Sequence, residues 1–373
     1  MEEKALLMAL AKVELNCSRW TDGFPHVSVH GRYPVLSNQE WTAGFWTGIL
    51  WLSFLVSGER RFVEVVQGLL PSFAERLFQG IHTDTHDLGF LYLLSCVPDG
   101  ELLGRGIYRE VALQAAEVLS QRFHRQGKYI QAFGKVPPEK EALTIIDSLM
   151  NLPLLYWAAG SAEKGKYVHI AAEHAKTLAA VLVREDGSTY QACRFRYPEG
   201  ELLWRGTMQG YKDWSCWSRG QAWAIYGFTL SYRYTGEAVF LEKALRASQY
   251  FLEHLPPDRV ACWDLLFRDD PEPRDSSAAA IAASGLLELA LVLEKERQED
   301  ASLFRKEAEL ILRALIERYA SFEDDCDGLL RHATYHLPKG WGIDECCIWG
   351  DYFYLESLLK VTGKYPSLWY YLR

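Results

Sequence analysis

The chain has little of what several common classes of protein require. Its 373 residues include 40 lysines and arginines against 49 aspartates and glutamates, which gives a net charge of −9. Because nucleic-acid binding needs a clustered basic surface, this balance argues against a nucleic acid as partner. Local cations, rather than the overall field of the protein, must therefore meet any anionic ligand.

Targeting and membrane signals are also missing. Residues Met1–Leu10 combine early acidic residues with a short apolar run, which is typical of an amphipathic helix and lacks the basic region of a signal peptide. No apolar stretch is long enough to cross a bilayer on this interpretation. We predict a cytoplasmic protein with no membrane partner, either a monomer or a homodimer.

Cysteine usage excludes a regular disulfide framework. The eight cysteines show no C-x-x-C spacing, and the adjacent pair Cys346 and Cys347 cannot form an ordinary disulfide without strain. Reduced thiols and no metal site are the expectation. The sequence also contains no G-x-S-x-G elbow, P-loop, dinucleotide fingerprint or H-E-x-x-H motif, so those chemistries lack support.

Helical periodicity dominates what is present. No Pro/Ser-rich linker divides the chain, so we predict one domain over residues 1–373. Two short segments, 128–132 and 188–195, carry strand signals. Apolar residues at helical spacing predict twelve helices, at 2–16, 41–57, 61–79, 87–95, 106–122, 143–158, 163–182, 217–235, 238–254, 275–293, 301–319 and 350–361.

Twelve helices in one undivided domain form six hairpins. An open solenoid would need polar caps at both ends, whereas a closed ring of six inner and six outer helices needs none. The inner helices should then be apolar nearly all round, as 41–56 and 217–234 are. The sequence therefore predicts an all-α fold, an (α/α)6 barrel.

Two aspartates lie in segments that otherwise have the composition of a protein core. Asp87 begins a predicted helix, where an acidic residue is often an N-cap. Asp147 has apolar neighbours on both sides, so its carboxyl should be desolvated and its pKa raised. The alternatives for Asp147 are a proton donor and a structural acid that pairs with an arginine or caps a turn.

A tryptophan-rich stretch, Gln209–Trp223, carries a central arginine. Arg219 and Trp223 are four residues apart and share a helix face, which allows either a structural cation–π pair or a clamp for a carboxylated sugar ring. Trp41 belongs to a group of aromatic residues that could simply be core, which is the better interpretation for most of them, and His86 is either a hydrogen-bond donor to substrate or a partner in a helix cap. Aromatic rings, an arginine and two carboxyls suit a site that binds a sugar acid and transfers protons.

Six ordered segments closely resemble the unsaturated glucuronyl hydrolases of glycoside hydrolase family 88: Glu40–Leu52, His86–Tyr92, Ile145–Leu155, Trp217–Phe228, Arg274–Ile281 and Ile348–Glu356. The resemblance spans almost the whole chain. It implies an (α/α)6 barrel, no metal or organic cofactor, and a substrate oligosaccharide that ends in a 4,5-unsaturated uronic acid. Protonation of the vinyl ether at C4 and addition of water at C5 give a hemiketal, which opens to release the next sugar.

The resemblance also implies site residues. Asp147 matches the acid/base and Asp87 the second carboxylate, while the substrate-binding positions are matched by Trp41, His86, Phe133, Gln191, Thr207, Gln209, Arg219 and Trp223. Three positions depart from the family pattern, because Phe133 stands where a Trp is common, and Gln191 and Met208 where a His is common. The loop His336–Trp341 lacks the serines of sulfate-preferring relatives. These departures concern the preference for the released sugar.

Four other functions remain as alternatives. An unsaturated rhamnogalacturonyl hydrolase shares the barrel and the chemistry but acts on pectin fragments. A sugar epimerase on this barrel needs paired histidines, and His86 has no obvious partner. A non-catalytic oligosaccharide-binding protein would gain nothing from two aspartates facing an anionic ligand. A helical scaffold for protein partners would not need two aspartates and an Arg–Trp face at one rim.

Overall fold

The computed structural model describes residues 1–160, 164–268, 271–295, 297–322, 326–364 and 368–370. Most predicted helices are present with ends shifted by one to three residues. The described helices are α1 (Glu2–Cys17), α2 (Ala43–Ser57), α3 (Arg60–Phe78), α4 (Leu88–Leu93), α5 (Cys96–Leu103), α6 (Gly106–Gln121), α7 (Leu152–Ala158), α8 (Lys164–Val181), α9 (Ser218–Thr235), α10 (Ala238–Glu253), α11 (Ser276–Leu293), α12 (Gln298–Ala314) and α13 (Ile348–Val361).

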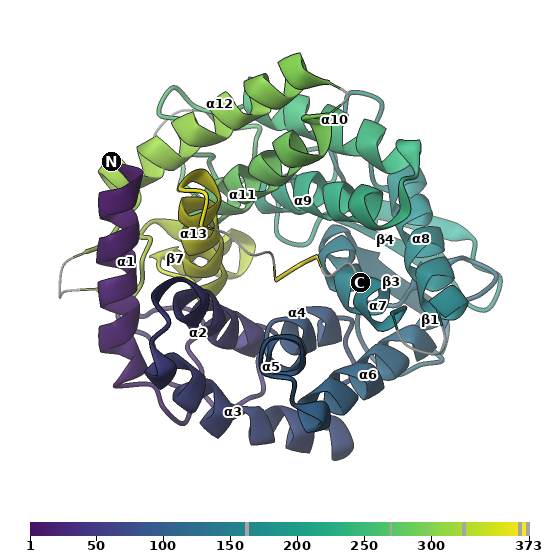
Figure 1. Ribbon diagram of the computed structural model, residues 1–373. Coiled ribbons are helices and arrows are strands. Elements are labelled where there is room, and N and C mark those ends of the chain that lie inside the picture. Colours follow the sequence, from purple (N-terminus) through teal and green to yellow (C-terminus); the bar gives the residue numbers. More distant parts are fainter. Residues whose placement is uncertain (161–163, 269–270, 296, 323–325, 365–367, 371–373) are drawn as a thin grey trace.

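These helices form two concentric rings (Figure 1). In the inner ring, α2 packs on α4, α4 on α7, α7 on α9, α9 on α11, α11 on α13, and α13 back on α2. The outer ring consists of α1, α3, α6, α8, α10 and α12, and the predicted (α/α)6 barrel is confirmed. The short helix α5 was not predicted as a separate element; it continues the chain from α4 towards α6.

The inner helices are apolar because both of their faces are covered. Within α11 every residue from Ser276 to Ala290 is buried. The prediction that no apolar stretch is long enough to cross a bilayer was wrong. The 18 residues of α11 have the length and mean hydropathy of a membrane span. However, 89% of that stretch is buried inside the protein, as is usual for the core helix of a barrel.

The loops between the helices contain three small sheets of short strands. β1 (Phe123–His124) pairs with β2 (Tyr129–Ile130), β4 (Ala192–Arg196) lies between β3 (Glu141–Ile145) and β5 (Leu202–Gly206), and β6 (Ala333–His336) pairs with β7 (Trp341–Glu345). All pairings are antiparallel. The predicted strand signals at 128–132 and 188–195 thus mark β2 and β4.

The predicted helix at 143–158 was wrong in its first half. Residues Glu141–Ile145 form β3, which pairs with β4 from Glu141↔Arg196 to Ile145↔Ala192. A 3₁₀ turn (Ile146–Asn151) follows, and α7 starts only at Leu152 with Pro153 in its first turn. The β-branched residues of this apolar run favour a strand once a partner is available. The change of direction after β3 places Asp147 at the rim of the barrel.

Candidate active site

A cavity of about 430 Å³ opens at the end of the barrel where the inner helices begin. Because helix N-termini carry partial positive charge, this end favours an anionic ligand despite the negative charge of the whole chain. The lining residues come from the loops that precede these helices, from the first turns of α9, from β3 and from the β6–β7 hairpin. They are Trp41, Asp87, Phe133, Ile145, Asp147, Met208, Gln209, Trp217, Arg219, Trp223, Tyr335, His336, Lys339 and Trp341.

Asp87 immediately precedes α4 but does not cap it with its side chain. Its Oδ2 instead accepts a hydrogen bond of 2.7 Å from the hydroxyl of Thr85. Burial raises the pKa of Asp87 to about 6, although hydrogen bonds from Thr85 and Asn151 and the charges of Arg76 and Arg122 act in the opposite direction. The N-cap alternative therefore does not account for this carboxyl.

Asp147 lies in the 3₁₀ turn after β3, and its side chain faces the cavity. Its Oδ1 is buried and has no hydrogen-bond partner among the described residues. Burial raises the pKa of Asp147 well above its ordinary value, and the negative charge of Asp87 raises it further. A protonated carboxyl that points into a cavity has the properties of a general acid.

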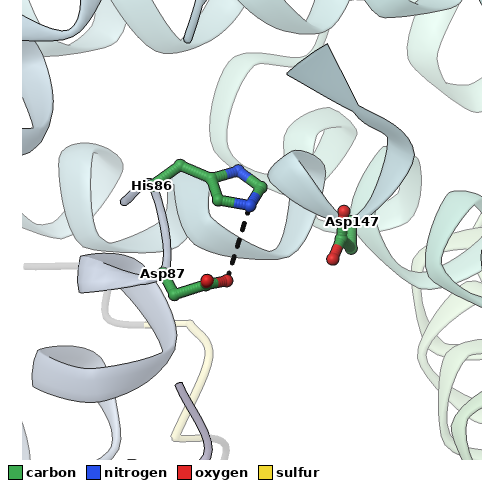
Figure 2. Close-up of side chains that lie close together, drawn as sticks. All are labelled: His86, Asp87 and Asp147. Carbon is green, nitrogen blue, oxygen red and sulfur yellow. Dashed lines mark ion pairs between the residues drawn. The ribbon is translucent and has the colours of Figure 1, made fainter. Parts of the chain in front are cut away.

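His86 lies beside both carboxyls (Figure 2). One ring nitrogen of His86 and one oxygen of each aspartate all lie within 4.8 Å of one another, and Nε2 is 3.5 Å from Oδ1 of Asp87. Burial lowers the pKa of His86 to about 3, so the ring is neutral. Its Nδ1 is 2.9 Å from Ser148 Oγ, which itself donates to the carbonyl of Ile145 at 2.6 Å. Nδ1 therefore carries the proton, and Nε2 presents a lone pair to the acids.

These three groups also have the chemical composition of a metal-ligand set. Among the described residues, no other group of three metal-ligating side chains converges in this way. The prediction that no metal or organic cofactor takes part stays a prediction.

The spacing between the two aspartates depends on close packing of α4 against the turn that carries Asp147. Asn151 Oδ1 accepts a hydrogen bond of 2.8 Å from the backbone N–H of Phe90. A Cβ atom at Gly89 would lie 2.3 Å from the Cα of Asn151 and 2.4 Å from its carbonyl oxygen. Glycine at position 89 is thus what allows the two segments to touch.

We expect Gly89→Ala to destabilise the protein by about 1–3 kcal/mol, because backbone and not a flexible side chain must move. Chemical denaturation measures this loss. Gly68→Ala is the matched control inside α3, where the nearest atom to a new Cβ is 3.9 Å away. The control should be neutral or up to about 1 kcal/mol more stable, since alanine favours a helix. Equal effects of the two substitutions would contradict the packing argument.

Gln191 and Thr207 were predicted to bind substrate, but neither lines the cavity. Gln191 is buried, and its Oε1 accepts hydrogen bonds from Thr207 Oγ1 (2.9 Å), the Met208 N–H (2.7 Å) and the Gln209 N–H (2.8 Å). Its Nε2 donates to Oε1 of Gln209 at 2.7 Å. Gln191 thus shapes the loop that carries Met208 and Gln209 to the cavity. A single imidazole nitrogen in its place could not accept three such bonds.

Arg219 reaches the cavity wall but is held by the protein. Its Nη1 donates to Oδ2 of Asp275 at 2.6 Å and to the carbonyl of Thr334 at 2.8 Å, and its Nη2 donates to the carbonyl of Tyr335 at 2.6 Å. Its guanidinium lies over the ring of Trp217 at 4.6 Å, rather than pairing with Trp223 as the sequence suggested. Only its remaining N–H groups could contact a uronic carboxylate, so its role as a clamp stays a prediction.

The predicted aromatic residues differ in how they meet the cavity. Phe133 is well exposed and contacts the ring of His86 edge-on at 5.3 Å. Trp41 is half-buried and packs on Trp349 at 5.1 Å, so it serves both the core and the cavity wall. Trp223 lines the floor of the cavity but is almost fully buried.

The β6–β7 hairpin contributes a wall that sequence reasoning missed. Tyr335, His336, Lys339 and Trp341 all line the cavity. His336 is buried with no hydrogen-bond partner for Nδ1 among the described residues, and burial lowers its pKa to about 4. The family resemblance connects the loop His336–Trp341 with the preference for the released sugar, but it does not show that this hairpin, more than a hundred residues after Arg219, forms a wall of the cavity.

Comparison with known proteins identifies the family of this site. The family model described as Glycosyl Hydrolase Family 88 matches residues 16–356. The chain belongs to this family. It is therefore a glycoside hydrolase, and the resemblance found in the sequence is confirmed. The matched region contains every residue that lines the cavity.

Individual members of family 88 are similar over nearly their whole length. The unsaturated glucuronyl hydrolase from Bacillus sp. GL1, described as responsible for the degradation of glycosaminoglycan, has a crystal structure with a TM-score of 0.93, 40% identity and 97% coverage of both chains. A solved UGL variant in complex with dGlcA-Glc-Rha-Glc gives the same values. An unsaturated chondroitin disaccharide hydrolase from Streptococcus pyogenes serotype M1 is 39% identical over 370 residues, which covers 98% of this chain and 92% of the relative.

Proposed function

We propose that the protein is an unsaturated glucuronyl hydrolase, which adds water across the C4=C5 bond of a 4,5-unsaturated uronic acid at the non-reducing end of an oligosaccharide. One observation carries the proposal: two carboxyls with raised pKa values face the same cavity, and Oδ1 of one of them, Asp147, has no hydrogen-bond partner among the described residues. A vinyl ether needs one proton donor and a nearby negative charge, and this pair supplies both.

In the proposed reaction, protonated Asp147 donates its proton to C4. The positive charge that develops at C5 and the ring oxygen is stabilised by ionised Asp87. Asp147, now a carboxylate, takes a proton from the water that attacks C5. The bare Nε2 of His86 accepts a hydrogen bond from a substrate hydroxyl or from water beside Asp87. The hemiketal that results opens and releases the next sugar.

Fragments of glycosaminoglycans are the proposed substrates. The Bacillus and Streptococcus relatives are described as acting on glycosaminoglycan and unsaturated chondroitin disaccharide. A UGL variant has been solved with dGlcA-Glc-Rha-Glc, a tetrasaccharide of another composition, so we include longer oligosaccharides that end in the unsaturated uronic acid among the proposed substrates. We also propose that the reaction takes place in the cytoplasm after import, where the eight free, buried cysteines stay reduced.

Loss of the ultraviolet absorbance of the C4=C5 chromophore tests the proposal. Purified protein is given unsaturated disaccharides from chondroitin, hyaluronan, heparin-type chains and pectin. Fastest loss with a glycosaminoglycan disaccharide is expected. Fastest loss with the pectin disaccharide would favour an unsaturated rhamnogalacturonyl hydrolase, and binding without any loss would favour a non-catalytic binding protein.

The pH dependence of kcat/KM tests the division of roles between the aspartates. Because Asp87 must be ionised, activity should fall as the pH drops below about 6, the pKa to which burial raises it. Because Asp147 must be protonated, activity should also fall at high pH. Ionised Asp87 raises the pKa of Asp147, so Asp87→Asn should move the alkaline limb to lower pH and remove the acid limb.

Thr85→Val provides the matched control for this profile. The Thr85 hydroxyl lowers the pKa of Asp87, so its removal should move the acid limb to higher pH while Asp87 remains present. The pH profiles of kcat/KM for the wild type, Asp87→Asn and Thr85→Val together test which aspartate gives each limb. An alkaline limb that stays in place in Asp87→Asn would contradict the proposed coupling of the two carboxyls.

A further inference from the structure

Beside the cavity lies a group of aromatic side chains that the proposed reaction does not use. It belongs to the segment 210–216, whose two neighbours in the chain, Gln209 and Trp217, both line the cavity. Within this segment Trp214 is 64% exposed and Tyr211 is 45% exposed. Because two residues of extended chain span at most about 7 Å, the backbone of Tyr211 lies close to Gln209.

The exposed rings of Tyr211 and Trp214 lie in one cluster with the half-buried ring of Phe267 and the buried ring of Trp263, and we call these four residues the aromatic platform. The ring of Tyr211 lies 5.2 Å from Phe267, 6.3 Å from Trp263 and 6.4 Å from Trp214. Trp263 and Phe267 stack at 5.8 Å with an interplanar angle of 25°. Two segments distant in sequence thus contribute rings to one cluster, which packs around the exposed side chains of Tyr211 and Trp214.

The loop beneath the platform is held rigidly. Oδ2 of buried Asp264 accepts hydrogen bonds from the Tyr211 N–H at 2.9 Å and from the hydroxyl of Ser215 at 2.6 Å. On the other side, Oδ1 of Asp213 accepts a bond of 2.9 Å from the N–H of Thr207, and Arg184 donates to the carbonyl of Asp213 at 3.1 Å. These contacts fix the backbone, so the exposed rings are presented with little loss of conformational freedom on binding.

Exposed aromatic rings on a rigid loop lose contact with water only when something covers them. Flat rings with polar edges suit a sugar, whose C–H groups pack on the ring face while its hydroxyls stay in water. The exposed rings belong to a segment whose two flanking residues, Gln209 and Trp217, line the cavity in which the proposed function places the terminal uronic acid. From this arrangement we propose that the platform binds a further sugar of the same oligosaccharide, beyond the bond that is broken. This inference rests on the proposed function.

Comparison of two substrates tests the platform. Wild type and variants are assayed with an unsaturated disaccharide and an unsaturated tetrasaccharide from the same polysaccharide. We expect Trp214→Ala to lower kcat/KM for the tetrasaccharide about tenfold, which corresponds to about 1.4 kcal/mol of lost contact, and to leave the disaccharide unchanged. Tyr211→Ala should act in the same direction, and Trp214→Phe should retain most of the tetrasaccharide activity because it keeps a ring.

Ile107→Ala is the control for removal of a large apolar surface group, because Ile107 is 70% exposed at the start of the outer helix α6 and lies outside the cavity and the platform. Ile107→Ala should leave kcat/KM unchanged for both the disaccharide and the tetrasaccharide. An unchanged tetrasaccharide rate in Trp214→Ala, or equal losses with both substrates, would overturn the platform. The platform would also be overturned if the wild type eluted as a dimer on size-exclusion chromatography and Trp214→Ala eluted as a monomer. A second copy of the chain would then cover these rings. Wild type that turns over neither substrate would overturn the proposed function itself.

Discussion

Asp147→Asn should abolish turnover while leaving the protein folded and able to bind substrate. A positioned general acid contributes about 10²- to 10⁴-fold to the rate, and asparagine cannot donate a proton to C4. The amide is nearly the same size as the carboxyl, and Oδ1 of Asp147 has no hydrogen-bond partner among the described residues whose loss would disturb the fold. Absorbance assays measure turnover, and isothermal titration with an unsaturated disaccharide measures binding.

The control for this substitution is another buried acid that lies outside the cavity. Asp99 in α5 is fully buried, burial raises its pKa, and neither carboxyl oxygen has a hydrogen-bond partner in the described part of the chain. Asp99→Asn should keep wild-type activity. If Asp147→Asn retained activity within about tenfold of wild type, about 1.4 kcal/mol of barrier, Asp147 would not be the acid.

Arg219→Ala should destabilise the whole protein by about 3–5 kcal/mol, because it leaves the buried carboxylate of Asp275 without its positive partner. Asp275 is fully buried, and its Oδ1 accepts hydrogen bonds from the backbone at the start of α11. Arg219 also ties α9 to the β6–β7 hairpin through the carbonyls of Thr334 and Tyr335. Chemical denaturation measures the loss of stability.

The double variant Arg219→Met/Asp275→Asn separates charge from packing. It removes both charges, keeps an acceptor at the N-cap of α11, and should be clearly more stable than Arg219→Ala. If instead Arg219→Ala unfolded like wild type and only raised KM, the arginine would act mainly as a clamp for the uronic carboxylate, as the sequence analysis suggested.

The fold could be predicted because each helix shows its apolar pattern within its own segment of the sequence. The inner helix α11 is apolar all round and α9 is buried from Ser218 to Ser231, and twelve such helices without a linker favour a closed ring. Residues 141–145 were misassigned because a short apolar run has no decisive periodicity, and its strand partner lies about fifty residues further along the chain.

The site could be predicted only in part. Asp87 and Asp147 were found from acids placed in apolar surroundings, and burial does raise both pKa values. The contacts of Gln191 and Arg219 could not be predicted, because their partners come from distant loops. That Lys339 and Trp341 line the cavity could not be predicted for the same reason, although the resemblance pointed to their loop.

The most direct test of the central claim follows the reaction by proton NMR in D₂O with an unsaturated disaccharide. The vinyl H4 signal and the signals of the released sugar are recorded in the same sample. If Asp147 protonates C4, the vinyl signal disappears no later than the released sugar forms, with deuterium delivered at first to one face of C4. Release of the sugar while the vinyl H4 signal persists would place cleavage at the anomeric carbon and contradict protonation of C4 by Asp147.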